Sequence, residues 1–89
     1  MSKEDLKREF KGKFLELRKI INSYDLIPHA PYDEFDVLNH KILSNLYKDA
    51  DFEKIKRVMN SELISYYGLF PNEVEIDKLA SEIMEWWNS

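Results

Sequence analysis

The clearest helix signal in the chain is DFEKIKRVMNSELISYYG, residues 51–68. Asp51 is of the residue type that caps helix N-termini, because its carboxylate accepts hydrogen bonds from the first free amides. Gly68 supplies the left-handed residue at which many helices end. Between them, apolar residues recur at spacings of three and four, the period of one helical face: Phe52, Ile55, Met59, Leu63 and Tyr66. The stretch therefore predicts a helix over residues 52–67.

The same period continues on both sides of this stretch. It predicts a helix over residues 37–48, with Asp36 as its N-cap and an apolar face made of Leu38, Ile42, Leu43 and Leu46. It also predicts a helix that Pro71 and Asn72 open, with Asn72 as its cap. The buried stripe of that last helix comprises Ile76, Leu79, Ala80, Ile83 and Trp87.

Residues 3–24 predict the longest helix, which Ser2 is expected to cap. Its apolar face comprises Leu6, Phe10, Phe14, Leu17, Ile21 and Tyr24. After it, Pro28 and Pro31 exclude a regular helix, because proline lacks an amide donor and forces extended geometry on the preceding residue. Residues 25–34 are therefore predicted to form an ordered loop.

No stretch alternates polar and apolar residues long enough to indicate a sheet. The pattern predicts an all-α fold, a small four-helix bundle with one Pro-containing loop between the first and second helices. Residues 1–89 should form a single domain around one contiguous core cluster. We expect that cluster to include Phe10, Phe14, Leu17, Ile42, Met59, Leu63, Ile83 and Trp87.

Composition excludes several classes of function. The chain has 89 residues, no Cys and a formal net charge of −4, which argues against nucleic-acid binding because phosphate contacts need clustered Lys and Arg. No apolar run suits a secretory signal or a membrane span, so we expect no membrane association and a cytoplasmic location. No nucleophile or phosphate-loop motif occurs, so the sequence predicts no enzyme activity and no cofactor.

A divalent-metal or small-ligand site is the alternative from another class. Asp36 and His40 are four residues apart on the predicted second helix, and Asp33 or Glu34 lies just before it. Carboxylate and imidazole groups are common metal ligands, although no paired-His or EF-hand spacing accompanies them. The simpler interpretation is that Asp36 caps the helix and that His40 is solvated.

Charge is distributed unevenly along the chain. Residues 1–19 carry seven basic side chains against four acidic ones, whereas residues 20–36 contain four acids and no Lys or Arg. Residues 72–89 contain five acids against one Lys. The chain is therefore basic at its start and acidic in its Pro-containing loop and last helix.

Two adjacent aromatic pairs, Tyr66-Tyr67 and Trp86-Trp87, follow the ends of apolar stripes. Neighbours on a helix point about 100° apart, which predicts one member of each pair inside. We expect Tyr66 and Trp87 in the core, with Tyr67 and Trp86 flanking it, either closing its rim or anchoring a partner.

These features together predict a non-enzymatic module that binds a basic protein. The contact residues would be Asp33, Glu34, Asp36, Tyr67, Glu82, Glu85 and Trp86. A structural homo-oligomer that uses the apolar rim is a further alternative.

Two resemblances bear on this prediction. The stretch DLIPHAPYDEFD, residues 25–36, resembles a family of short, uncharacterised all-helical proteins from Gram-positive bacteria, which implies the same fold. The stretch FLEL, residues 14–17, is similar to the first helix of the colicin-nuclease immunity proteins, and the spacing of Tyr66-Tyr67 from EIMEW, residues 82–86, is also similar. That resemblance implies an inhibitor of a basic partner. The acidic second helix of those proteins has no counterpart here, because residues 37–48 contain no Asp or Glu.

Overall fold

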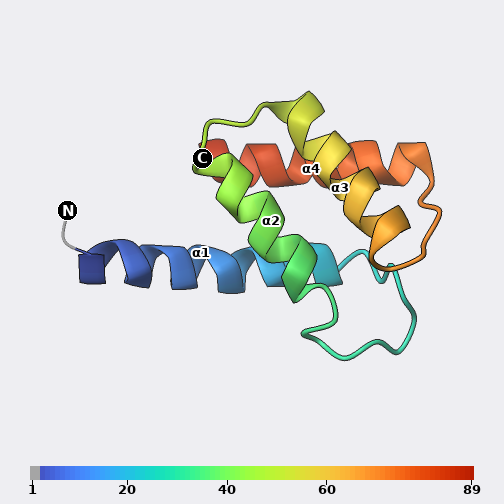
Figure 1. The fold of residues 1–89 in the computed structure, drawn as a ribbon, viewed down its shortest axis with the longest axis horizontal. Coiled ribbons are helices and arrows are strands. Elements are labelled where there is room, and N and C mark those ends of the chain that lie inside the picture. Colours follow the sequence, from blue (N-terminus) through green and yellow to red (C-terminus); the bar gives the residue numbers. More distant parts are fainter. Residues whose placement is uncertain (1–2) are drawn as a thin grey trace.

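A computed structural model describes residues 3–89 of the chain. Four helices account for most of these residues (Figure 1). They are α1 (Lys3–Asn22), α2 (Asp36–Leu46), α3 (Phe52–Ser65) and α4 (Glu73–Asn88). Within residues 3–89 there is no strand, so the predicted all-α four-helix bundle is confirmed. The expected cap Ser2 lies outside the described residues.

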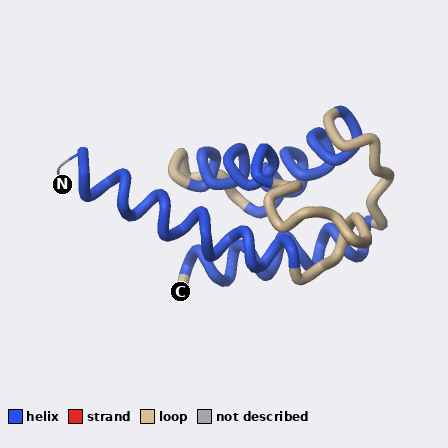
Figure 2. Tube along the Cα trace, turned by 90° about the horizontal axis from the view of Figure 1, so that it is seen from below, coloured by secondary structure: helices blue, strands red, loops and turns tan. Residues whose placement is uncertain are grey.

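The helices pack in a ring, because each contacts the next along the chain and α1 closes the ring against α4. Figures 1 and 2 show the α1–α2 and α3–α4 loops at the same end of the bundle. The apolar faces meet inside and bury one cluster of side chains. Its members are Leu17, Ile21, Phe35, Leu38, Ile42, Leu43, Leu46, Ile55, Met59, Leu63, Ile76, Leu79, Ala80 and Ile83.

Five of the eight residues predicted for the core cluster belong to it, and the other three are only partly buried. Phe10, Phe14 and Trp87 pack against the buried cluster from its edge. Leu6, which continues the same helical stripe, is 50% exposed. Both views show that the first turns of α1 extend beyond the other three helices, which accounts for the exposure of Leu6 (Figures 1 and 2).

Two predicted helix starts and the predicted conformation of Gly68 are confirmed in atomic detail. The carboxylate of Asp51 accepts a hydrogen bond of 2.9 Å from the Lys54 amide. The side-chain oxygen of Asn72 accepts one of 2.8 Å from the Val74 amide. Gly68 has a φ of 67°, the left-handed conformation expected after a helix end.

Asp36 was expected to cap α2, and that expectation is wrong. Phe35 occupies the N-cap position and makes no side-chain capping bond, while Asp36 is the first residue of the helix. The physical reason is a stronger partner, because the Asp36 carboxylate pairs with the guanidinium of Arg18 on α1. The predicted ends of α1, α2 and α3 were each two residues too late, since turns at residues 23–24, 47–48 and 66–67 replace their last predicted residues.

Among residues 3–89, no helix combines the length and the apolar composition that crossing a membrane requires.

We predict that Leu17→Ala lowers the free energy of unfolding by about 2 to 5 kcal/mol, because Leu17 is fully buried and the truncation leaves a cavity. Leu15→Ala is the matched control, since Leu15 lies on the same helix and is 44% exposed. It should change stability by no more than about 0.5 kcal/mol. Urea denaturation followed by circular dichroism measures both, and equal losses would show that the buried face of α1 is misplaced.

Candidate functional site

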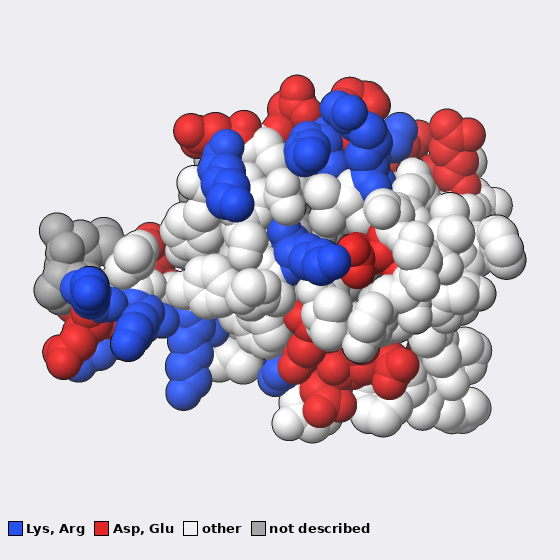
Figure 3. All heavy atoms as spheres, in the orientation of Figure 1, with Lys and Arg blue, Asp and Glu red and all other residues white. Residues whose placement is uncertain are grey.

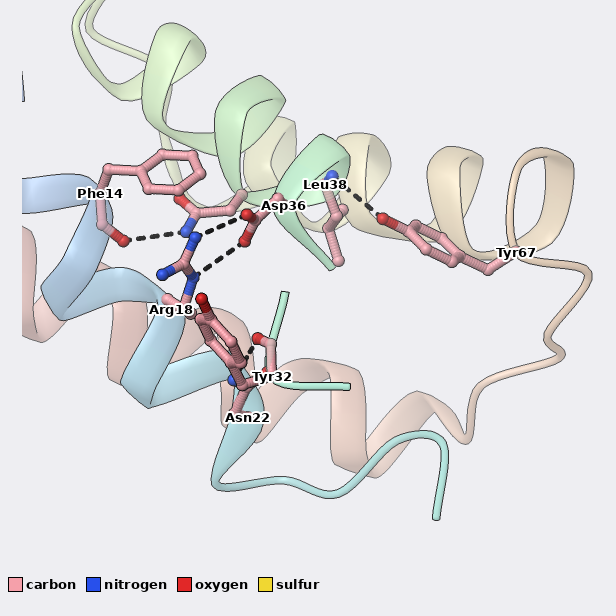
Figure 4. Close-up of polar contacts among 8 residues, drawn as sticks. Phe14, Arg18, Asn22, Tyr32, Asp36, Leu38 and Tyr67 are labelled. Carbon is pink, nitrogen blue, oxygen red and sulfur yellow. Dashed lines mark hydrogen bonds and ion pairs between the residues drawn. The ribbon is translucent and has the colours of Figure 1, made fainter. Parts of the chain in front are cut away.

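An ion pair fixes the end of the α1–α2 loop (Figure 4). Nε and Nη2 of Arg18 donate hydrogen bonds of 3.0 and 2.6 Å to the two carboxylate oxygens of Asp36. This two-point geometry sets the orientation of both groups. The hydrogen bond with Asp36 raises the pKa of the Arg18 guanidinium. The guanidinium carbon also lies 4.9 Å from the centre of the Tyr32 ring and 5.3 Å from that of Phe14.

Further contacts hold the middle of the same loop. The side-chain amide of Asn22 donates a hydrogen bond of 2.7 Å to the Tyr32 carbonyl (Figure 4). Phe35 is buried in the core. Just beyond it, the side-chain amide of Asn39 on α2 donates a hydrogen bond of 2.9 Å to the Phe14 carbonyl on α1. The loop therefore has contacts to α1 at its middle and at its end, although it contains no regular secondary structure.

Tyr67 joins the α3–α4 loop to the α1–α2 loop. Its ring lies 4.9 Å from the Phe35 ring, and its hydroxyl accepts a hydrogen bond of 3.4 Å from the Leu38 amide. Burial raises the pKa of the Tyr67 phenol, and the charge of Glu34 acts in the same direction. The two loops therefore meet at the Phe35–Tyr67 contact.

The expectation that Tyr66 lies inside is wrong, whereas Tyr67 flanks the core as expected. Tyr66 is 62% exposed, whereas Tyr67 packs against the core. The prediction assumed that the helix continues through both tyrosines, but α3 ends at Ser65. Tyr66 and Tyr67 therefore do not follow the helical period. Of the tryptophans, Trp87 packs at the core edge and Trp86 is also partly buried.

The surface around this contact combines acidic and aromatic groups. Asp33 and Glu34 are exposed and form no ion pair within residues 3–89. Tyr32, which precedes them, is 69% exposed. We call the surface formed by Tyr32, Asp33, Glu34, Tyr66, Tyr67 and Phe70 the loop end.

The loop end lies within two segments that lack basic side chains. Residues 20–40 and 58–77 contain eight acids and no Lys or Arg. These segments also carry six of the eight large apolar side chains that the described chain exposes. In Figure 3, Lys and Arg gather on the projecting part of α1 and across the top, whereas the right-hand end, where both loops lie, is white and red.

Phe70 is a part of this surface that our sequence reasoning missed. It is 89% exposed, the highest value among the large apolar residues described. Its neighbour Leu69 packs against the core, with its amide bonded at 2.7 Å to the Leu63 carbonyl, and Pro71 restricts the chain on the other side. The sequence does contain a signal for this exposure. Phe70 lies between Gly68 and Pro71, outside any helical period.

Three candidates on α4 form a separate group. Glu82 and Glu85 are exposed, and with Glu75 the charge of Glu82 adds to burial in raising the pKa of Tyr24. Trp86 lies under Lys13 of α1, whose Nζ is 5.2 Å from the ring centre. Asn22, the residue of α1 that bonds to the loop, follows Lys13 by nine residues. The two side chains therefore lie about 180° apart around α1. Trp86 and the loop therefore contact opposite sides of that helix.

The three residues of the metal-binding alternative do not form a ligand set. Within residues 3–89, no three His, Asp or Glu side chains are placed to hold one metal ion. The carboxylate of Asp36 is engaged by Arg18, and His40 packs edge-on against Phe10 with ring centres 5.7 Å apart. His40 is exposed, as the simpler interpretation expected.

Comparison with known proteins adds no relative to this description: no protein-family model matches the chain, and neither the curated proteins nor the solved structures include a match. The resemblances to a helical bacterial family and to immunity proteins therefore stay predictions.

We predict that Asp36→Asn loosens the α1–α2 loop, because a neutral amide cannot replace both charge-assisted bonds to Arg18. Hydrogen exchange measured by mass spectrometry should become faster over residues 32–38. Asp33→Asn removes the same charge from an unpaired position three residues away and should leave exchange unchanged. Equal effects of the two substitutions would mean that the ion pair does not hold the loop.

We predict that the protein loses stability as pH rises above about 10, the ordinary pKa of tyrosine. The pKa values of Tyr24, Tyr47 and Tyr67 are all raised in the folded state, chiefly by burial. As pH rises, the unfolded chain therefore loses these protons before the folded chain does. The free energy of unfolding is constant below about pH 10 and falls as pH rises from there to the folded-state pKa values. Denaturation midpoints measured from pH 7 to 11 should show a shallower decline for Tyr67→Phe than for the parent. An unchanged slope would contradict the burial of this phenol.

Proposed function

We propose that this protein is a non-enzymatic binding module whose loop end contacts a basic protein. The observation that supports this proposal is the meeting of two segments without Lys or Arg at the Phe35–Tyr67 contact. This arrangement puts the unpaired carboxylates of Asp33 and Glu34 beside exposed aromatic rings.

The two kinds of group have different tasks in binding. Exposed carboxylates that form no ion pair attract a positively charged partner and speed the encounter. Aromatic side chains bury large apolar area at a small cost in conformational entropy, which makes them the usual anchors of interfaces. Tyr32 directly precedes Asp33, and Tyr66 packs against Tyr67, whose phenol feels the charge of Glu34. The loop end therefore has both steering groups and anchors.

The rigidity of the loop also favours binding. Binding through a mobile loop costs conformational entropy, whereas a loop already held in place avoids most of that cost. The bonds of Arg18 to Asp36 and of Asn22 to the Tyr32 carbonyl hold this one. They anchor the chain on both sides of Asp33 and Glu34 and leave those two side chains exposed.

The α4 group has a secondary role in this proposal. Glu82 and Glu85 add to the negative field that the partner meets, while Trp86 packs between Lys13 and the core. A small acidic protein can inhibit a basic enzyme by covering its active surface, which is the kind of role that the predicted resemblance to colicin-nuclease immunity proteins implies. We therefore propose inhibition of a basic enzyme as the more specific form of this function.

The test begins with capture of a partner by the tagged chain and proceeds to binding kinetics. We expect the double substitution Asp33→Lys, Glu34→Lys to slow association and to reduce its dependence on salt. Tyr66→Ala should mainly speed dissociation, because it removes an anchor and leaves the charges in place.

Glu82→Lys, Glu85→Lys is the matched control, since it makes the same change of charge on α4. Its effect on association should be the smaller one. If the α4 pair has the larger effect, or if the loop pair leaves both rates unchanged, the contact does not lie at the loop end.

A further inference from the structure

A groove between α2 and α3 is lined by hydrogen-bond donors from both helices. Its volume is about 310 Å³. The donors that line it are Lys41 and Asn45 on α2 and Lys54, Arg57 and Ser61 on α3. Residues three or four apart are neighbours on a helix, so each set occupies one face of its own helix. The two helices therefore present their donors to the same space.

The residues that line the groove carry a net positive charge. Lys41 is neutralised by Glu62, which also lines the groove and whose carboxylate oxygen lies 2.6 Å from the Lys41 Nζ. Lys54 and Arg57 form no ion pair with any residue of the described chain. Glu53 is four residues before Arg57 but does not line the groove. The groove therefore has two positive charges that are not paired, and Figure 3 shows Lys and Arg side chains gathered over α3.

The neutral donors of the groove are also available to a ligand. Nδ2 of Asn45 donates a hydrogen bond of 2.7 Å to the Lys41 carbonyl, one turn earlier on α2. This bond holds the side chain against its helix and uses one of the two amide hydrogens, so the second can bind a ligand. The Ser61 hydroxyl is exposed and can donate a further hydrogen bond. Val58 also lines the groove and offers apolar contact to carbon atoms.

These groups match a phosphate monoester. Its phosphate carries a charge of about −1.5 to −2 at pH 7 and has three strong acceptor oxygens. Arginine binds phosphate through two parallel N–H bonds, and lysine binds it as a point charge. Two unpaired cations and two neutral donors therefore suit both its charge and its acceptors. The groove volume of about 310 Å³ lies near the lower end of the range for small-molecule pockets, which favours a small ligand.

We propose that this groove binds the phosphate group of a small phosphomonoester. Lys54 and Arg57 contact the phosphate oxygens, and the two neutral donors complete their hydrogen bonding. The ion pair of Lys41 with Glu62 joins α2 to α3 beside the ligand and holds the two sides of the groove together. None of these residues belongs to the loop end, so the inference goes beyond the proposed function and does not depend on it.

Titration of the full chain with glycerol phosphate, followed by nuclear magnetic resonance, provides the first test. At constant ionic strength we expect the ester to shift the amide signals of residues 41–45 and 54–61. Glycerol, which lacks the phosphate, should shift none of them. Dimethyl phosphate has a single charge and should bind about tenfold more weakly, the effect of losing a bond between charged groups. Equal binding of dimethyl phosphate, or binding of inorganic phosphate without any response to the ester, would overturn the proposal.

Two charge-removing variants locate the site. Lys54→Gln and Arg57→Gln should each raise the Kd of glycerol phosphate about tenfold, because each removes a hydrogen bond between charged groups. Lys19→Gln and Arg8→Gln are the matched controls, since both residues are exposed on α1 and do not line the groove. Equal losses of affinity in the controls would show a general attraction of anions to the protein and would overturn the site.

Ser61→Ala separates a built phosphate site from a concentration of positive charge, because it removes a donor and leaves every charge in place. It should raise the Kd about threefold, the effect of losing a neutral hydrogen bond. Ser81→Ala is the matched control, since Ser81 is exposed on α4 and does not line the groove. If neither serine substitution changes the Kd while Lys54→Gln raises it, charge alone attracts the anion and the proposed site is wrong.

Discussion

The loop end depends on the ion pair between Arg18 and Asp36. The segment between α1 and α2 has two prolines and two residues with positive φ, Asp25 and His29, so helical hydrogen bonding cannot order it. The bonds of Arg18 to both oxygens of Asp36 fix where α2 begins relative to α1. Burial of Phe35 then places the Tyr67 contact, through which the α3–α4 loop joins the same surface.

Much of this architecture is predictable from the sequence, because its causes are local. The period of the apolar residues indicates four helices, and Asp51, Gly68 and Asn72 mark their boundaries through bonds that span only a few residues. The acidic character of the loop is also visible in the sequence. The sequence also shows that residues 58–77 contain no Lys or Arg. It does not show that the fold brings this segment into contact with the α1–α2 loop.

The remaining details arise from contacts between distant residues. The local sequence pattern predicts that Asp36 caps its helix. Arg18, 18 positions earlier, instead binds the Asp36 carboxylate, because a guanidinium binds a carboxylate more strongly than neutral amides do. The orientation of Tyr66 and Tyr67 depends on where α3 ends, and its last turn yields to the packing of Tyr67 on Phe35. Trp86 is similarly partly buried because Lys13 of α1 lies over its ring.

The ring of helix contacts has a consequence for how the chain folds. Three of its four helix pairs join neighbours in the sequence, and only the α1–α4 pair joins the two ends of the chain. Closing a loop costs more entropy as the loop lengthens, so the local pairs can form cheaply and the α1–α4 pair bears most of the closure cost. From this topology we expect folding on the microsecond to millisecond scale of helical bundles, with the docking of α1 against α4 as its late step.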